Sequence, residues 1–592
     1  MAQQPNSAAP SKELKAIYDS IGKLQITEVD RPNSPRVRSL FKRLDGILRR
    51  ERPFAVLEHG PPVRRHGDRR MLSLTDPQIA HALTALRTFV MISGQIGAFK
   101  LPLTPEVGRV SQHLFQYIPV VLDWMEILHP MNDHLQPASG AHGYQELSRI
   151  LAGMLRAVCT PNLYGAREEM YEYIFTTPTM TYLADLWINL FRYTANPTLD
   201  TVAMLMQLMY GFAKEIHPKF ESSRVARELI LSTVRQRIRK KTRRLCHAIS
   251  RYGVYLEGST EPHCEVTSAQ LFALGSLFAT DPEVLDNVCP REDIRTLVRL
   301  LDVHVGRRNW LTVSLGANYL ASFWRLALDN RAFEWAINDG VIGTFLNAFT
   351  LCDDYAALED LQRAGDILPR HFNSWRVLHT FHQNTTDLLP KLRRASSHHP
   401  VIADWMIAYD ERIIALDRAR DSYKRRRERC MYSECSQSLT EPGIKALACE
   451  GKDAWYCSAQ CQRADWKERH RHICRSGVVP TVSQRDWSFM GMLAVFHVDY
   501  HRHSVLNEVL SADPNRRRRI ALHVDLRQPR ITHKVKVLGE KPPGDPWKAK
   551  LFVCWHEWKD STHYFGEIFD LDAMLEELEK EAAAASVADS PA

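Results

Sequence analysis

Residues 430–474 read CMYSECSQSLTEPGIKALACEGKDAWYCSAQCQRADWKERHRHIC, and this stretch decides how the chain is organised. It holds six of the twelve cysteines, in the spacings Cys-x4-Cys and Cys-x3-Cys, and it ends in His-x3-Cys. Thiolate and imidazole groups at such spacings suit tetrahedral zinc. Nothing in the sequence indicates secretion, which argues against a disulfide-bonded knot, and the spacing argues against chance clustering. We therefore predict a zinc-binding segment.

The segment is expected to be structural rather than catalytic. Few apolar residues lie between Cys430 and Cys474, so the metal must supply much of the folding free energy. A site closed by four protein ligands leaves no open position for a substrate or a catalytic water. Elsewhere the sequence shows no convergent nucleophile and no cofactor-binding loop. The sequence therefore predicts a protein without catalytic activity.

The run YCSAQCQRADW over Tyr456–Trp466, followed by His470 and Cys474, resembles the MYND-type zinc finger. MYND fingers bind two zinc ions in a cross-braced arrangement. The resemblance implies a first site made by four cysteines, namely Cys430, Cys435, Cys457 and Cys461. It implies a second site that includes Cys449, His470 and Cys474. The overall layout, with helices before the finger and a small domain after it, also resembles fungal MYND-domain proteins.

One cysteine of the family pattern is absent from this chain. The family has a Cys-x2-Cys pair that includes Cys449, but here Glu-Gly-Lys-Asp follows this residue. A fourth ligand could come from Glu450, from Asp453 or from water. His472 suits the role less well, because it lies two residues from each of the neighbouring ligands. Losing a thiolate lowers zinc affinity, so we predict one tightly bound zinc and a second that is weaker or absent.

The resemblance also implies what the finger binds. Fingers of this family bind proline-rich peptides, and by resemblance Gln462 and Trp466 would contact the peptide. Aromatic rings suit polyproline ligands physically. The other interpretation of Trp466 is that it is the packing anchor of the finger. The expected function is a scaffold that binds protein partners through the finger and the helical region, in transcriptional regulation.

Two alternative functions are disfavoured. Some MYND fingers occur in SET-domain lysine methyltransferases, which carry an Asn-His-x-Cys motif and a glycine-rich loop, and neither occurs here. Basic runs at 235–244, 424–429 and 516–519 permit nucleic-acid contact, but the net charge of +8 is modest and the finger lacks a recognition helix. The run 424–429 is either a nuclear import signal or a solvated helix face, so a nuclear or cytoplasmic location is expected.

Residues 12–425 are predicted to be almost entirely helical. A clear case has apolar residues on one face at helical spacing, namely Val37, Leu40, Phe41, Leu44, Ile47 and Leu48. Several helix starts pair a capping residue with proline, namely Ser34-Pro35, Asp76-Pro77, Thr104-Pro105 and Asp281-Pro282. So many serial helices predict a stacked armadillo or HEAT-like region, although no clean repeat period is visible. The core candidates of the segment 310–349 are Trp324, Leu326, Trp335, Ile337, Val341, Ile342 and Leu346.

The composition is that of a globular protein with several domains. Its 592 residues are 45% hydrophobic and 25% charged. Residues 1–11 are polar and are expected to be disordered, with no signal-peptide core. No run of 18 or more apolar residues is present, so no membrane span is expected. The cysteines outside the finger are scattered singly, as in a reducing compartment.

The pattern changes after the finger segment, 426–476. Residues 477–572 combine a helix over 484–511 with period-two alternation, and this predicts a small α+β domain. Three histidine motifs stand out, namely His497-Val498-Asp499, His501-Arg502-His503 and His523-Val524-Asp525. Residues two apart do not share a helix face, so no metal or catalytic site is expected there. A charged helix that frays into a disordered tail is predicted over 573–592.

Overall fold

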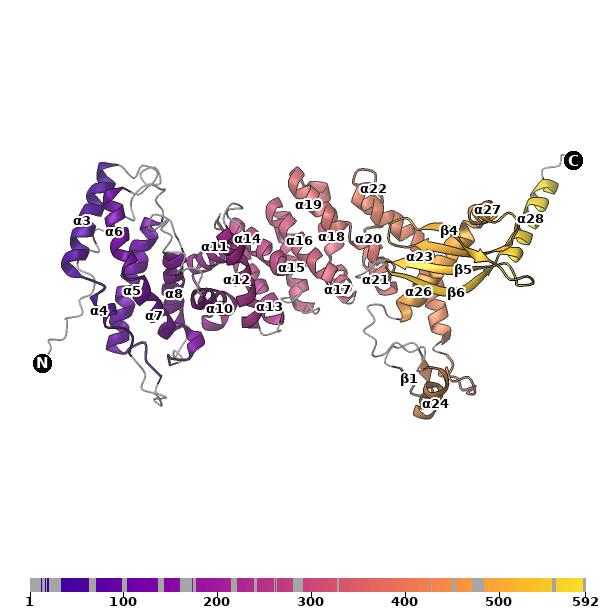
Figure 1. Cartoon of the computed structure of the whole chain (residues 1–592), viewed down its shortest axis with the longest axis horizontal. Coiled ribbons are helices and arrows are strands. Elements are labelled where there is room, and N and C mark those ends of the chain that lie inside the picture. The colour runs from indigo at the N-terminus through magenta and orange to yellow at the C-terminus, as the bar shows by residue number, and fades with distance from the viewer. Residues whose placement is uncertain are drawn as a thin grey trace. The chain divides into compact units, whose positions relative to one another are not determined.

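The computed structural model shows a mainly helical protein with a small sheet near its C-terminus (Figure 1). The chain forms two compact units, Met1–Asp293 and Ile294–Ala592. The structure describes residues 12, 16, 19–20, 34–62, 71–97, 104–136, 143–159, 173, 177–214, 221–238, 242–259, 261, 263–279, 291–326, 330–426, 428–449, 454–470, 484–555 and 561–588. The predicted disorder of residues 1–11 lies outside this set.

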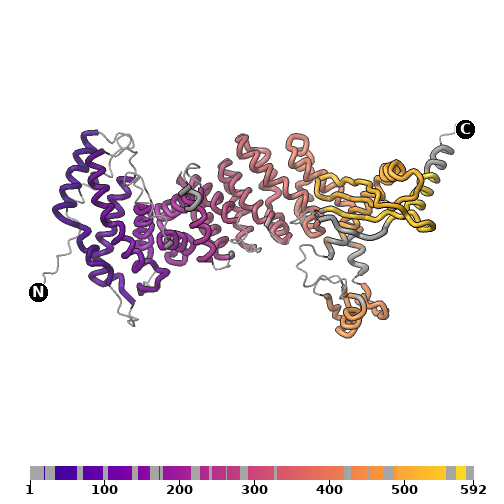
Figure 2. Tube along the Cα trace, viewed as in Figure 1, coloured from indigo at the N-terminus to yellow at the C-terminus, as the bar shows by residue number. Residues whose placement is uncertain are grey.

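In the part of the first unit that the structure describes, helices follow one another along the chain (Figure 2). They are α3 (Pro35–Glu51), α4 (Ala55–Glu58), α5 (Pro77–Ile96), α6 (Pro105–Phe115), α7 (Ile118–Leu128), the 3-10 turn η1 (Pro130–Asn132), α8 (Gly143–Cys159), α10 (Thr177–Tyr193), α11 (Leu199–Ala213), α12 (Glu221–Ile238), α13 (Thr242–Glu257) and α14 (His263–Ala279).

Local sequence explains where these helices begin and which face they bury. The side chains of Ser34, Asp76 and Thr104 accept hydrogen bonds from backbone N–H groups of the first turn, and proline follows each of them. The predicted start at Asp281-Pro282 lies outside the described residues. The apolar face predicted for α3 is buried over its whole length. Helix α5 is long and apolar enough to cross a membrane, but about half of it (56%) is buried inside the structure, as in a core helix.

The second unit continues the helical region. Its helices are α15 (Arg291–Gly306), which begins at the boundary, α16 (Trp310–Leu326), α17 (Arg331–Asn338), α18 (Val341–Leu351), α19 (Tyr355–Gly365), α20 (Leu368–His371), α21 (Trp375–Thr385), α22 (Leu389–Ala395) and α23 (Pro400–Arg426). Trp324 stacks on Phe333, with ring centres 4.7 Å apart, and both are buried. The predicted core residue Trp335 is only half-buried, and the guanidinium of Arg331 lies 5.9 Å from the centre of its ring. The armadillo or HEAT type of repeat stays a prediction.

A four-stranded sheet with three accompanying helices follows in the same unit. Its elements are α26 (Gln484–Tyr500), α27 (Arg502–Ala512), β3 (Arg518–Asp525), β4 (Thr532–Glu540), β5 (Lys548–Trp555), β6 (Ser561–Asp570) and α28 (Leu571–Ala588). The strand order is β4-β3-β5-β6, with β3 parallel to β5 and the other pairs antiparallel. Ile520, Leu522 and Val524 of β3 are buried, and so is the small Ala521 between the first two.

Two boundaries differ from the sequence prediction. The helix predicted over 484–511 is two helices, because the backbone departs from helical geometry at His501. Helix α28 begins at Leu571, two residues before the predicted boundary at 573, and runs through the alanine-rich segment to Ala588, since alanine has the highest helix propensity of any residue type.

Helices of the second unit also hold the sheet. Helix α23 packs against α26, and the guanidinium of Arg418 lies 4.3 Å from the centre of the Phe496 ring. Arg412 of α23 is fully buried and donates to the side-chain oxygen of Asn373 at 2.9 Å. It also donates to three backbone carbonyls of the loop after β3, those of Leu526, Gln528 and Pro529. These contacts hold α23, which precedes the zinc-binding segment in the sequence, against the sheet, which follows it.

Candidate metal centre and peptide-binding surface

The segment predicted to bind zinc has its own small framework. Strands β1 (Leu447–Ala448) and β2 (Trp455–Tyr456) pair antiparallel, and helix α24 (Ala459–Asp465) leads into a single π-helical turn, η3 (Trp466–His470). The Ser458 side chain accepts a hydrogen bond from Cys461 N at 3.2 Å and so starts α24. This cap fixes the turn that carries Cys457 and Cys461.

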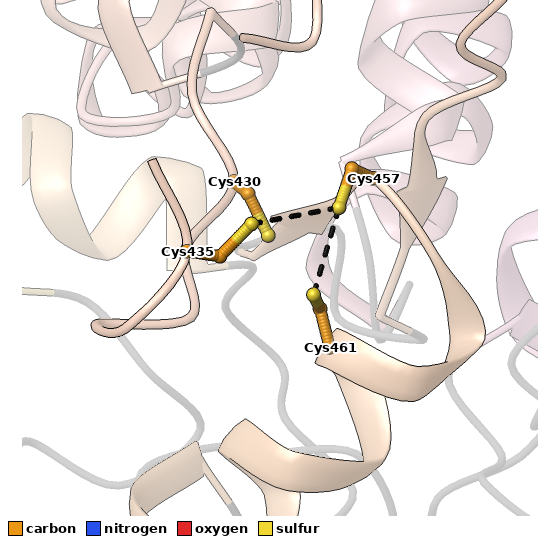
Figure 3. Close-up of side chains that lie close together, drawn as sticks. All are labelled: Cys430, Cys435, Cys457 and Cys461. Atoms are coloured by element: carbon orange, nitrogen blue, oxygen red, sulfur yellow. Dashed lines mark hydrogen bonds between the residues drawn. The ribbon is translucent and has the colours of Figure 1, made fainter. Parts of the chain in front are cut away.

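Four cysteines point toward one another between this helix and the loop before β1 (Figure 3). Their sulfur atoms all lie within 4.8 Å of one another, and the four residues are Cys430, Cys435, Cys457 and Cys461. The Sγ atoms of Cys435 and Cys457 are 3.7 Å apart, and those of Cys457 and Cys461 are 3.5 Å apart. Zinc–sulfur bonds of about 2.3 Å in a tetrahedron separate the sulfurs by about 3.8 Å. The four thiols therefore fit one zinc ion.

Zinc binding at these thiols has to displace their protons. Burial raises the pKa of Cys430 and raises the pKa of Cys457 to about 12, whereas the backbone N–H of Gln437 lowers the pKa of Cys435. Four thiols so close together resist losing their protons, since the thiolates would repel one another. A bound zinc ion removes that penalty by replacing the protons, so its affinity rises with pH.

The residues predicted for the second zinc site are only partly described. Cys449 and His470 are both buried, at 5% and 3% exposure. Cys474 and the candidate fourth ligands Glu450, Asp453 and His472 lie outside the described residues. The composition of the second site stays a prediction.

A tyrosine is the packing anchor of the finger. Tyr456 is fully buried, and its hydroxyl donates to Asp465 Oδ2 at 2.8 Å, with Asp465 also buried. The other members of this core, Cys430, Leu439, Cys449 and Ala454, are buried around it. Sequence reasoning gave Tyr456 and Asp465 no role, because only the fold brings β2 against the end of α24. The N-cap at Ser458 could have been predicted, because a serine directly before a helical segment is a common capping signal.

The two residues predicted to bind peptide lie one helical turn apart. Trp466 is 42% exposed, and its ring centre lies 5.9 Å from that of His470. Gln462 is half-buried, with its amide nitrogen 3.5 Å from the carbonyl oxygen of Ala448. Because Tyr456 occupies the core, the Trp466 ring is available at the surface. The peptide-binding role of Trp466 stays a prediction.

The basic runs are only partly described. Arg237 has a structural role, since its Nε donates a hydrogen bond to the buried Asp185 at 3.0 Å. Arg516 lies over the Trp547 ring, 5.5 Å from its centre. Side chains of the run 424–427 lie outside the described set, so the import signal stays a prediction.

Comparison with known proteins identifies the finger and little else. A family model described as MYND finger matches residues 430–474. No curated protein matches the chain. Among solved structures, a crystal structure of an engineered protein is 11% identical and covers 68% of this chain and 98% of its own, with a TM-score of 0.24. A score this low does not establish a shared fold. Residues 430–474 are thus a MYND finger, a zinc-binding protein-interaction domain.

Proposed function

We propose that this protein is an interaction scaffold whose MYND finger binds short proline-rich segments of protein partners, in transcriptional regulation. The single observation that carries the proposal is the exposed Trp466 ring beside Gln462, on a finger whose core is already filled by Tyr456. A large exposed aromatic ring is the usual anchor for a polyproline segment, because the preformed ligand loses little conformational entropy on binding.

The proposal assigns no catalytic role to the finger. Its complete site offers four thiolates and no open coordination position, so zinc there stabilises the fold and activates no water. The alternative, a lysine methyltransferase, has no motif in the sequence to support it. Methyl transfer from S-adenosylmethionine to protein lysine, shown to depend on residues of this chain, would overturn the proposal.

The peptide proposal is tested on the full-length protein with a proline-rich peptide library. Trp466→Ala is expected to weaken binding of selected peptides by about tenfold or more, as buried interface aromatics do, and Gln462→Ala to weaken it less. Tyr355→Ala is the matched control, because Tyr355 is an 81% exposed aromatic residue of the same unit, outside the finger. Zinc content is measured in parallel. Unchanged affinity in Trp466→Ala would refute the surface, and loss of zinc in that variant would support the packing-anchor interpretation instead.

A further inference from the structure

Three histidines meet between α26 and the edge strand β4. His497 lies on α26, His501 follows one turn later where the backbone bends toward α27, and His533 lies on β4. His497 is buried at 9% exposure, and its Nε2 is 2.9 Å from Nδ1 of His533. Sequence reasoning compared His501 with His503 and expected no site. It missed His533, which only the pairing of β4 with β3 brings to this position.

The spacing of the three rings approaches that around a single metal ion, and His501 has to move to complete it. Ring centres lie 4.6 Å apart for His497 and His501, 5.1 Å apart for His497 and His533, and 6.3 Å apart for His501 and His533. Three imidazoles on one tetrahedral ion, with metal–nitrogen bonds of about 2.0–2.1 Å, place their ring centres about 5 Å apart. Two of the three separations match this value, and a movement of about 1 Å by the exposed His501 would bring the third close to it.

A carboxylate supports the same assignment. Oε1 of Glu508, on α27, lies 3.3 Å from Nε2 of His533. Nε2 of His533 is buried and makes no hydrogen bond in this geometry, so a small rotation of the exposed Glu508 would let its carboxylate accept the Nε2 proton and leave the lone pair of Nδ1 free to face His497. Histidine ligands of metals are commonly oriented in this way by a carboxylate on their far nitrogen. The alternative is a plain hydrogen bond between two neutral histidines, which would not require His501.

We propose that His497, His501 and His533 form a binding site for a divalent transition metal of the zinc class, with Glu508 as the residue that orients His533. Imidazole is a preferred ligand for zinc, copper and nickel, and three such ligands leave one position for water or a partner group. The site is separate from the finger, because it uses no cysteine and lies on other elements. An exposed His501 gives the ion access from solvent.

The test uses the full-length protein with Zn²⁺ and Co²⁺ as probes. Wild-type protein is expected to bind one more equivalent of Zn²⁺ than His501→Ala, and the variant to bind at this site at least tenfold more weakly. Co²⁺ separates the two kinds of site, since thiolates of the finger give strong charge-transfer absorption and imidazoles do not. Glu508→Gln is expected to weaken binding by about tenfold, as removal of such partners does.

A matched control is present two residues away. His503 is also exposed, and its Nε2 lies 3.9 Å from a carboxylate of Glu581, so His503→Ala should bind metal as wild type does. Melting temperatures without added metal show whether each variant is folded, and added Zn²⁺ should raise that of wild type and not that of His501→Ala. Equal metal content in wild type and His501→Ala would overturn the proposal and leave the His497–His533 contact as a hydrogen bond. A loss of metal in His503→Ala would overturn it too.

Discussion

His129 shows at the scale of one residue how burial sets the charge of a side chain. It is fully buried in the first unit, and its ring stacks on that of Tyr182 with centres 5.1 Å apart. Its Nε2 lies 3.1 Å from the carbonyl oxygen of Tyr182, and its Nδ1 accepts from Met131 N at 3.3 Å. Burial lowers the pKa of His129 from 6.5 to about 4, which keeps the ring neutral.

His129 should make the first unit less stable in acid. Above pH 6.5 the ring is neutral in both states and adds no pH dependence. As the pH falls from 6.5 to about 4, the unfolded chain takes up a proton that the folded chain excludes, so stability is lost. The loss approaches about 3 kcal/mol at the lower end. His129→Gln should flatten this slope in urea unfolding measured between these pH values, whereas His59→Gln, at an exposed histidine, should not. An unchanged slope in His129→Gln would contradict the assignment.

Much of the finger at this scale could be predicted, because the cysteine spacing indicates zinc and the family resemblance assigns the ligands. The cluster of Cys430, Cys435, Cys457 and Cys461 follows from short-range sequence spacing and the resemblance. The anchor Tyr456 and its partner Asp465 could not be found in this way, because an aromatic residue reads as core or surface only after the strand and the helix have met. His533 was missed for the same reason, since strand pairing acts over a long sequence separation.

Close approach of two helices depends on one glycine at the end of α19. A side-chain carbon added at Gly365 would lie 2.7 Å from Val401 Cγ1 and 3.2 Å from Phe349 Cζ. The indole N–H of Trp405 donates to the carbonyl of Gly365 at 2.9 Å, so α19 and α23 cannot easily separate. Gly365→Ala should therefore destabilise the second unit by about 1–3 kcal/mol, as overpacking does.

The control for this prediction is Gly343→Ala in α18, where the nearest atom would be 3.8 Å away. There the lower backbone entropy of alanine should leave stability unchanged or raise it by up to about 1 kcal/mol. Chemical denaturation of both variants measures the difference. If the two substitutions have equal effects, the helices do not rely on this contact.

The finger should hold one zinc ion tightly. Its first site has four thiolates within 4.8 Å, whereas the second has only Cys449, His470 and Cys474 by resemblance. We expect Cys457→Ser to unfold the finger and Cys449→Ser only to loosen it, because thiolate ligands supply the folding free energy. Metal analysis of each protein after mild chelation measures the retained zinc. Two equally retained ions at the finger would sink this expectation and indicate a fourth ligand at the second site. These measurements are made in the His501→Ala background, so that zinc bound at the proposed histidine site is not counted as zinc of the finger.

Element boundaries were predictable where local rules apply and not elsewhere. The caps of α3, α5 and α6 follow from a capping residue and proline. The parallel pairing of β3 with β5 and the bend at His501 could not be foreseen, because they depend on contacts between distant residues. The mainly helical class was confirmed, since amphipathic spacing recurs along most of the chain.

At the scale of the whole molecule, the chain should not melt in one step. It has two compact units, Met1–Asp293 and Ile294–Ala592, and the finger belongs to the second. Proteins with several domains commonly unfold in separable transitions. Scanning calorimetry of the full chain should therefore resolve more than one transition. Removing zinc should leave the transition of the first unit unchanged, and Cys457→Ser should behave as the chelated wild type does. A shift of every transition on chelation would show that the units are thermodynamically coupled.

The finger is inserted between two helices, α23 and α26, which pack on one another. If the metal is lost, the residues from 427 to 483 become a closed loop whose ends stay pinned by the helices. The entropic cost of closing a loop grows only with the logarithm of its length. An unfolded insert therefore reduces the stability of the α23–α26 contact only slightly. The scaffold should thus survive metal starvation intact while the finger alone opens. In a cell, this would make partner capture depend on zinc supply without exposing the rest of the protein to degradation.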